Sequence, residues 1–489
     1  MIRATLLRGA SVCRLYFCAF LFVPCIGMAD DDDGPVYFDW GPIASRMEGI
    51  DGIVRKQAIG PFYEHGDAPG GDQFSAYRPL YVRYLDAGSG RLHREYFWPV
   101  AVSKTVDDHH YWRFLLAYYY NWDTTAPNSR SRFMVFPFYY QGRDSKGENF
   151  FAVWPIGGTL REMFWNDKIT FVLWPIRIKT EINESRTSHW VWPIYAKGSG
   201  ENMERFRVLP FYGRYTRDRV TRKSIMWPFH TSVSYLSPTA EGDGYILWPL
   251  WAHFSYPSEE TWMVLPPFFR WTQSDKLTKR HLPFPFIQTG TGEVEKFYVW
   301  PLWGTKKMPG NSSWFFLWPL VNRQRIDKPE GVLHRFRIVP IAWKDWTVTR
   351  DEDGTEPEVL SSYFKLWPLF SWRKAGDRAS FRSLALWPMK NTGPVRRNWE
   401  PFWTLYKRNW VEDASESELL WGLYRHRCGP EDYRYLSLFP LFTCQDGGQT
   451  EDSSSFSILK GFFGMERHGE TRRWQVLYFL RFGGKEKAH

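Results

Sequence analysis

Residues 314–321 read Trp-Phe-Phe-Leu-Trp-Pro-Leu-Val, and the motif at their centre, Trp318-Pro319-Leu320, decides how the whole chain is interpreted. The same Trp-Pro-apolar motif, or a close variant, returns about every 19 residues along the sequence, as expected when one supersecondary unit is used many times. The ten clearest copies begin at Trp98, Trp154, Trp174, Trp192, Trp227, Trp248, Trp300, Trp318, Trp367 and Trp387. The sequence therefore predicts a repeat architecture.

Each repeat combines a short apolar segment with a polar loop. Residues 171–178 are an example of the apolar segment, and residues 141–149 of the loop. The segments are rich in Val, Ile, Phe, Tyr and Trp, which favour strands, and a central proline excludes a helix. We therefore predict an all-β chain of about 24 repeats, each with a strand centred on Trp-Pro-Leu and a polar loop.

The proline complicates a simple strand. It has no N–H to donate to a sheet ladder, so a proline in every antiparallel strand would weaken every second interface. In residues 314–321 the alternate positions are apolar on both sides, which predicts that both faces are covered at mid-strand. An alternative is that the units act as tight hairpins, joined or bent at the proline.

Two architectures fit this pattern. The first is an antiparallel meander closed as a large β-barrel in the outer membrane of a Gram-negative cell. The second is a β-solenoid or an array of stacked hairpins with a continuous aromatic core. Cys428 and Cys444 separate the two: the meander places them at opposite ends of neighbouring strands as free thiols, whereas the solenoid brings them close enough for a disulfide.

The first 29 residues have the pattern of a secretory signal peptide. Arg3, Arg8 and Arg14 precede an apolar run, and Gly27-Met28-Ala29 offers a cleavage site. We expect residues 30–482 to form one repeat-built β domain and residues 483–489 a polar tail. Removal of the signal takes away three of the 63 Lys and Arg residues and none of the 53 acidic ones, so the net charge falls to 60 − 53 = +7. Bases and acids mix in the same loops, so no basic face for nucleic acid is expected.

The sequence contains no motif that specifies chemistry. It has no Gly-x-Ser-x-Gly elbow, P-loop, Rossmann glycine triplet or His-Glu-x-x-His, and we expect no catalytic, cofactor or metal site. The ten anchor tryptophans are expected to be buried, so that Trp300→Ala would cost about 3–5 kcal/mol. These features predict a non-enzymatic outer-membrane barrel that contacts lipid or other envelope components. The alternative is a periplasmic or cell-surface scaffold that binds a glycan or a protein.

Overall fold

The computed structural model describes residues 36–235, 241–350, 358–430, 432–447, 453–469 and 471–483. The expected signal segment, the acidic loop at residues 351–356 and most of the expected tail lie outside these ranges. The described residues form one sheet of 46 strands, in which each strand pairs antiparallel with the next. The all-β prediction is confirmed.

The strands fall into three consecutive groups. The first group is β1 Val36–Trp40, β2 Ala44–Glu48, β3 Val54–Ala58, β4 Tyr63–Asp67, β5 Gln73–Tyr77, β6 Tyr81–Asp86 and β7 Arg91–Tyr96. The second group, named the arc, is β8 Ala101–Val106, β9 His109–Phe114, β10 Ala117–Asn121, β11 Ser131–Val135, β12 Tyr139–Arg143, β13 Asn149–Val153, β14 Gly157–Met163, β15 Asn166–Val172, β16 Arg177–Ile182, β17 Ser185–Trp190, β18 Tyr195–Gly200, β19 Met203–Val208, β20 Tyr212–Arg217, β21 Val220–Ile225, β22 His230–Tyr235, β23 Gly242–Leu247, β24 Trp251–Tyr256, β25 Glu259–Val264, β26 Phe269–Ser274, β27 Leu277–His281, β28 Ile287–Gly292, β29 Glu295–Val299, β30 Trp303–Met308, β31 Asn311–Phe316, β32 Val321–Lys328 and β33 Gly331–Ile338. The third group is β34 Ala342–Val348, β35 Val359–Leu366, β36 Phe370–Ala375, β37 Arg378–Ser383, β38 Tyr406–Val411, β39 Ala414–Leu419, β40 Tyr424–Cys428, β41 Arg434–Leu438, β42 Phe442–Asp446, β43 Ser453–Ile458, β44 Phe463–His468, β45 Thr471–Val476 and β46 Leu480–Phe482.

The two long edges of this sheet differ in chemistry. Nearly every connection from an odd-numbered strand to the next strand is apolar, and most of these connections carry the Trp-Pro motif or its variant. The exceptions include Arg78, Lys460 and the helical connection 384–405. The connections from even-numbered strands are nearly all polar and include the predicted loops. Because a meander turns at alternate edges, all the Trp-Pro turns lie along one edge, named the rim, and the polar loops lie along the other.

The predicted strand centred on Trp-Pro-Leu is wrong. Trp318-Pro319 lies in the turn between β31 and β32, and the other Trp-Pro copies occupy equivalent connections. A proline in a turn removes no donor from the ladder, so the expected weakening of every second interface does not occur. One unit is therefore a hairpin with two strands, as the hairpin alternative proposed, and the 46 strands make 46 / 2 = 23 units rather than about 24.

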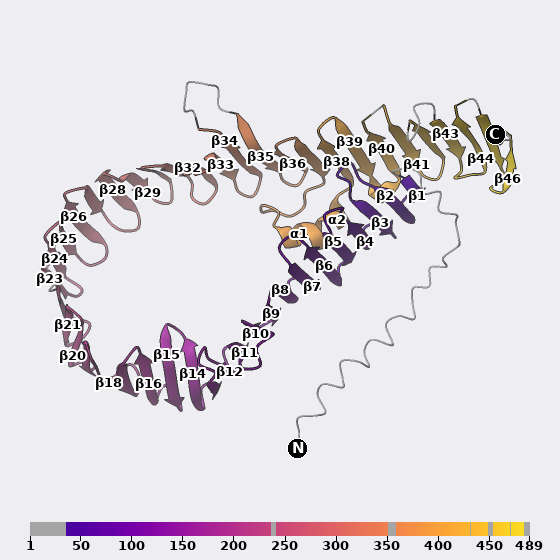
Figure 1. The fold of residues 1–489 in the computed structure, drawn as a ribbon. Coiled ribbons are helices and arrows are strands. Elements are labelled where there is room, and N and C mark those ends of the chain that lie inside the picture. Colours follow the sequence, from indigo (N-terminus) through magenta and orange to yellow (C-terminus); the bar gives the residue numbers. More distant parts are fainter. Residues whose placement is uncertain are drawn as a thin grey trace, which may run out of the picture.

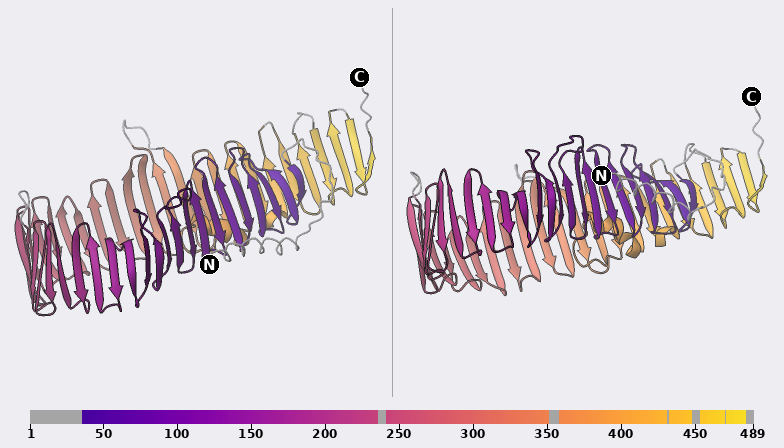
Figure 2. Two further views of the ribbon diagram at one scale, coloured as in Figure 1. Left: turned by 60° about the horizontal axis from the view of Figure 1, so that its bottom comes forward. Right: turned by 90° about the horizontal axis from the view of Figure 1, so that it is seen from below.

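The predicted closed barrel is also wrong, because β1 and β46 do not pair and the sheet is open. Figure 1 shows that the ribbon bends back on itself, so that its first strands lie against β36 to β42 while β43 to β46 extend beyond β1. This two-layer region is named the seam. Two short helices, α1 Gly393–Asn398 and α2 Glu400–Trp403, replace the turn between β37 and β38 and lie beside the seam at the rim edge (Figure 2).

The register of the sheet lines side chains up in rows parallel to the rim. Counting along a strand from the rim, successive residues alternate between the convex face and the concave face. Asp39 and Arg425 both stand second from the rim, and they contact each other across the seam, so second positions face the concave side. The first and third positions form two convex rows, and the second and fourth positions form two concave rows.

Candidate functional site

The rim is the main apolar surface of the molecule. Among the described residues, the exposed large apolar side chains lie on rim connections or in the two convex rows, with four exceptions near the polar edge. Leu250 and Ile156 on the rim are 66% and 65% exposed. The four exceptions are Phe164, Trp165, Val359 and Leu360. An apolar surface of this extent on a folded chain marks an interaction site.

The anchor tryptophans form a ladder on this rim and are not core residues. None of the ten side chains is buried, so the expected buried core is wrong. Neighbouring rings contact one another instead: the centroid distance is 5.5 Å between Trp154 and Trp174, and 6.2 Å between Trp174 and Trp192. Trp300 and Trp318 repeat this contact at 6.0 Å. The sequence shows the regular recurrence of these tryptophans but not their exposure, because a turn has fewer neighbours than a strand.

The backbone of the rim is hydrogen-bonded from turn to turn. The Trp192 N–H donates to the Pro175 carbonyl oxygen at 2.8 Å, and the Trp318 N–H donates to the Pro301 carbonyl oxygen at 2.7 Å. The Val191 N–H likewise reaches the Ile176 carbonyl oxygen at 2.6 Å. These bonds satisfy the groups that would be costly in an apolar medium. The rim can therefore enter an apolar medium while the backbone hydrogen bonds between its turns stay intact.

The two convex rows next to the rim carry no Asp or Glu on any of the 46 strands. The first row is almost wholly apolar, with Arg177 as an exception. The second row mixes aromatic residues with twelve bases, namely Arg46, Lys56, Arg83, Arg94, Lys179, Lys197, Arg214, Lys223, Arg280, Arg323, Lys344 and Arg408. The surface therefore passes from apolar to aromatic and basic with distance from the rim.

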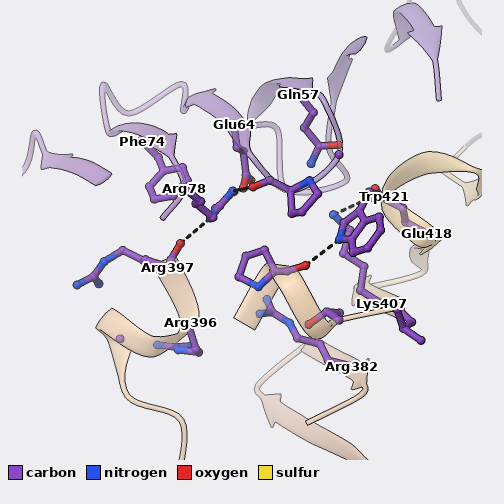
Figure 3. A pocket seen from close by; sticks show the side chains of 16 residues that line it. Gln57, Glu64, Phe74, Arg78, Arg382, Arg396, Arg397, Lys407, Glu418 and Trp421 are labelled. Atoms are coloured by element: carbon purple, nitrogen blue, oxygen red, sulfur yellow. Dashed lines mark hydrogen bonds and ion pairs between the residues drawn. The ribbon is translucent and has the colours of Figure 1, made fainter. Parts of the chain in front are cut away.

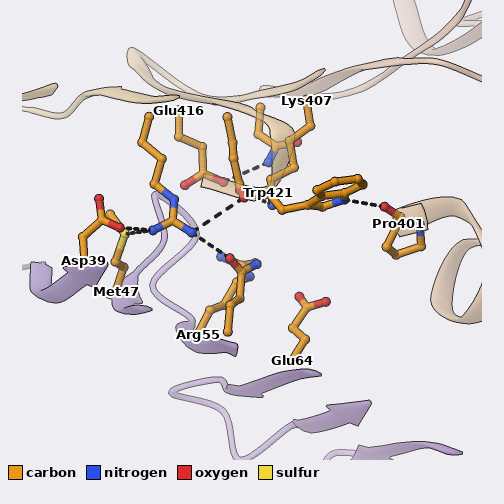
Figure 4. Close-up of polar contacts among 12 residues, drawn as sticks. Asp39, Met47, Arg55, Glu64, Pro401, Lys407, Glu416 and Trp421 are labelled. Atoms are coloured by element: carbon orange, nitrogen blue, oxygen red, sulfur yellow. Dashed lines mark hydrogen bonds and ion pairs between the residues drawn. The ribbon is translucent and has the colours of Figure 1, made fainter. Parts of the chain in front are cut away.

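The seam is held by buried ionic contacts between residues far apart in the sequence. The Arg425 guanidinium on β40 donates to the Asp39 carboxylate on β1 at 2.5 Å and to the Gln57 side-chain oxygen on β3 at 2.9 Å. The Tyr435 hydroxyl donates to the second Asp39 oxygen at 2.6 Å. Figure 4 shows Asp39 and Met47 on one side of this contact and the strands that carry Lys407 on the other. Both charged groups of the Asp39–Arg425 pair are almost fully buried.

These contacts shift the pKa values of two seam carboxylates. Burial acts to raise the pKa of Asp39, but the charges of Arg425 and Lys460 outweigh it and hold that pKa below its usual value. Burial also acts to raise the pKa of Glu64, and Arg78 and Lys407 lower it to about 2. Both carboxylates are therefore ionised at neutral pH and held in place by cations.

Helix α1 adds a second set of contacts to the seam. The Asn398 amide donates to the Glu95 carboxylate at 2.5 Å, and Arg397 forms an ion pair with the same group. Figure 3 shows Arg78 between Glu64 and the Arg397 backbone, to which it donates at 2.5 Å and 2.6 Å. The cavity here measures about 300 Å³, and each carboxylate at its wall has a basic partner. The arrangement holds the two layers together around this cavity.

The two cysteines singled out in the sequence lie on strands of the seam. Cys428 on β40 and Cys444 on β42 are both free thiols. Their predicted place at opposite ends of neighbouring strands is wrong: each repeat contributes two strands, so β41 lies between the cysteines, and they stand opposite Arg434 and Leu436 of that strand. In the part of the chain that the structure describes, no three His, Cys, Asp or Glu side chains are grouped to hold a metal ion. No helix within the described ranges is long and apolar enough to cross a membrane.

No known family model and no curated protein matches this chain.

Sequence reasoning missed the segregation of charge. In the polar loops bases and acids do mix, but in β8 to β33 the four positions nearest the rim contain no Asp or Glu. The signal was present in the sequence. The Trp-Pro motifs mark the rim turns, so the distance of each residue from the rim can be counted in the sequence. By that count, every Asp and Glu of residues 101–338 lies in the half of the sheet that ends in polar loops.

Proposed function

We propose that this protein is a non-enzymatic structural protein of the cell envelope that binds a membrane surface with its rim. The rim enters one leaflet edge-on, and the strands stand in the water above it. The observation that carries the proposal is the confinement of exposed large apolar side chains to the rim and the convex rows beside it.

The order of chemistry above the rim supports a membrane rather than a protein partner. Aliphatic and aromatic turn residues would enter the acyl region, and aromatic rings would lie at the interface, where Trp and Tyr are favoured. The acid-free row of Arg and Lys would then meet anionic head groups, where each base contributes about 1 kcal/mol. Water solvates Asp and Glu as well as Arg and Lys, so exposure to water alone does not explain why this row lacks acids on all 46 strands.

Vesicle flotation tests the proposal. The variant Ile176→Ser/Val191→Ser/Ile194→Ser changes three exposed side chains on neighbouring rim turns, so folding should be little affected. Each buried aliphatic side chain contributes about 1.5–3 kcal/mol, so we expect at least about a tenfold loss of vesicle binding. The matched control is Trp165→Ser at the polar edge, where Trp165 is 97% exposed.

Equal binding by the rim variant, the control and the unaltered protein would contradict the proposal. A protein that does not float with any vesicle would favour the alternative of a periplasmic or cell-surface scaffold for a glycan or a protein. The export signal and the outer-membrane location expected from residues 1–29 remain predictions, and N-terminal sequencing of envelope material tests the signal.

A further inference from the structure

The concave face of the arc carries unbalanced positive charge. Its two rows contain twelve bases and no Asp or Glu from β8 to β33. The bases are Lys104, Arg113, Arg132, Arg205, Arg207, Arg222, Arg270, Lys279, Lys296, Lys306, Arg335 and Arg337. No second layer of strands packs on this part of the sheet (Figure 1). Within these two rows no acid stands opposite the bases as in the seam, although Arg270 forms an ion pair with Glu259 near the polar edge, with 3.6 Å between Nη2 and Oε1.

One of these bases and a neighbouring histidine have side-chain nitrogens without hydrogen-bond partners within the described chain. Arg207 on β19 has two buried guanidinium nitrogens, Nε and Nη2, with no hydrogen-bond partner. His189 on β17 is 6% exposed, and its Nδ1 also has none. Between them on β18 stands Ala196, so the two groups flank a small residue in the first concave row. The two Arg207 nitrogens are donors, and a buried donor without an acceptor costs about 1–3 kcal/mol, which an anion would recover.

The pKa shifts within this group also favour an anionic ligand. Burial lowers the pKa of His189 to about 4, and the charges of Arg205 and Arg207 act in the same direction. Burial also lowers the pKa of Arg207, with Arg205 again contributing. Arg205 adds a second guanidinium in the next concave row, two residues along β19. Guanidinium groups in such a pair bind phosphate oxygens with two parallel hydrogen bonds.

An apolar pocket adjoins this group on the same face. It has a volume of about 340 Å³, and its wall includes Phe171 and Ile178 of the first concave row. In that row, Ile178 stands directly opposite His189, so the apolar wall ends where the polar group begins. The pocket also includes rim tryptophans Trp174 and Trp192. An apolar pocket beside a cationic group matches a ligand with a hydrocarbon chain and an anionic head.

We propose that the concave face of β12 to β21 binds one anionic lipid molecule, with its acyl chain in the apolar pocket and its phosphate on Arg205 and Arg207. This inference rests on the proposed function, because the lipid would come from the membrane that the rim binds. Arg207 and Arg205 stand second and fourth from the rim. At about 3.4 Å per residue they lie roughly 7 and 14 Å above the first residue of the turn, near the level of lipid head groups.

Fluorescence titration of the full chain with single-chain lipids below their micelle concentration tests the site, because Trp174 and Trp192 line the pocket. The probes are lysophosphatidylglycerol, which is anionic, and lysophosphatidylcholine, which is zwitterionic. We expect the anionic lipid to bind at least tenfold more tightly, and Arg205→Gln/Arg207→Gln to abolish that preference. The matched control is Arg186→Gln/Arg219→Gln, which removes two exposed charges near the polar edge, outside the convex and concave rows, and should retain the preference.

Inorganic pyrophosphate distinguishes a lipid from a soluble phosphate compound. It should bind at least tenfold more weakly than lysophosphatidylglycerol, since it leaves the apolar pocket empty. Pyrophosphate binding as tight as the lipid, equal loss in both double variants, or no preference in the unaltered chain would each overturn the proposal. Because these probes are monomers in solution, a failure here is separate from a failure of vesicle flotation, which tests the rim.

Discussion

The seam and the arc use the same rows of one sheet in opposite ways. In the seam, the first concave row places Asp39 and Glu95 opposite cations from the other layer. Glu64 in the same row pairs with Arg78 of its own layer, and Lys407 of the other layer also lowers its pKa. In the arc, the same row and its neighbour carry bases without any acid. Buried charges that are paired hold two surfaces together, whereas charges of one sign on an open face attract ligands of the opposite sign. The difference supports a structural role for the seam and is the basis of the ligand site proposed on the arc.

The largest effect expected from this comparison is at Arg425. The substitution Arg425→Leu leaves the Asp39 carboxylate buried with a weaker set of partners, and loss of one member of a buried pair costs about 3–5 kcal/mol. Urea unfolding followed by circular dichroism measures the change. The control is Arg222→Leu on the concave face of the arc, where we expect a change below about 1 kcal/mol. Equal losses at both positions would remove the distinction between the two regions.

Acid should weaken the seam more than the arc. The pKa of Glu64 is about 2 in the folded chain, against 4.5 in an unfolded one. A lowered folded pKa contributes stability that is present above pH 4.5 and is lost as the pH falls toward 2. The difference corresponds to about 3 kcal/mol. Urea midpoints measured from pH 6 to pH 2 test this, and Glu64→Gln should show a smaller dependence. An identical pH profile for the variant would contradict the ionic account of the seam.

A smaller effect is expected for the tryptophan ladder of the arc. Trp300 lies on the rim between Phe286 and Trp318, with centroid distances of 6.1 Å and 6.0 Å. Aromatic pairs contribute about 0.5–1.5 kcal/mol each, so Trp300→Ala should cost about 1–3 kcal/mol. This value replaces the larger cost expected for a buried residue. Trp165→Ala at the polar edge is the control, and a cost of 5 kcal/mol at Trp300 would restore the idea of a tryptophan core.

The smallest expected effect is a change in the free energy of unfolding that has opposite signs in the two regions. Lys306 stands directly opposite Lys296 on the concave face of the arc, and like charges in this position destabilise a sheet by about 0.2–1 kcal/mol. Lys306→Gln should therefore raise the free energy of unfolding slightly. Lys407→Gln in the seam should lower it, because Lys407 pairs with Glu418. Differential scanning calorimetry of both variants measures the two signs, and a shift in the same direction would contradict the comparison.

Local features of the candidate site were predictable, and long-range ones were not. The Trp-Pro anchors were located correctly as a repeated ladder, since they are visible in the sequence itself. Their exposure was missed because apolar residues on both sides of a proline resemble a covered strand until the proline is assigned to a turn. The pair Asp39 and Arg425 could not be found, because 386 positions separate them and neither belongs to a distinctive motif.

By itself, the sequence determined the all-β class, a repeat of about 19 residues and the polar loops that separate the apolar segments. These properties depend on turn chemistry and side-chain patterns within about 20 residues, where neighbouring strands must pair. Only the tertiary structure decided that the sheet stays open, which face is concave and where the two ends meet. Those outcomes depend on small bends added over 46 strands and on buried charges that meet only after that curvature has accumulated.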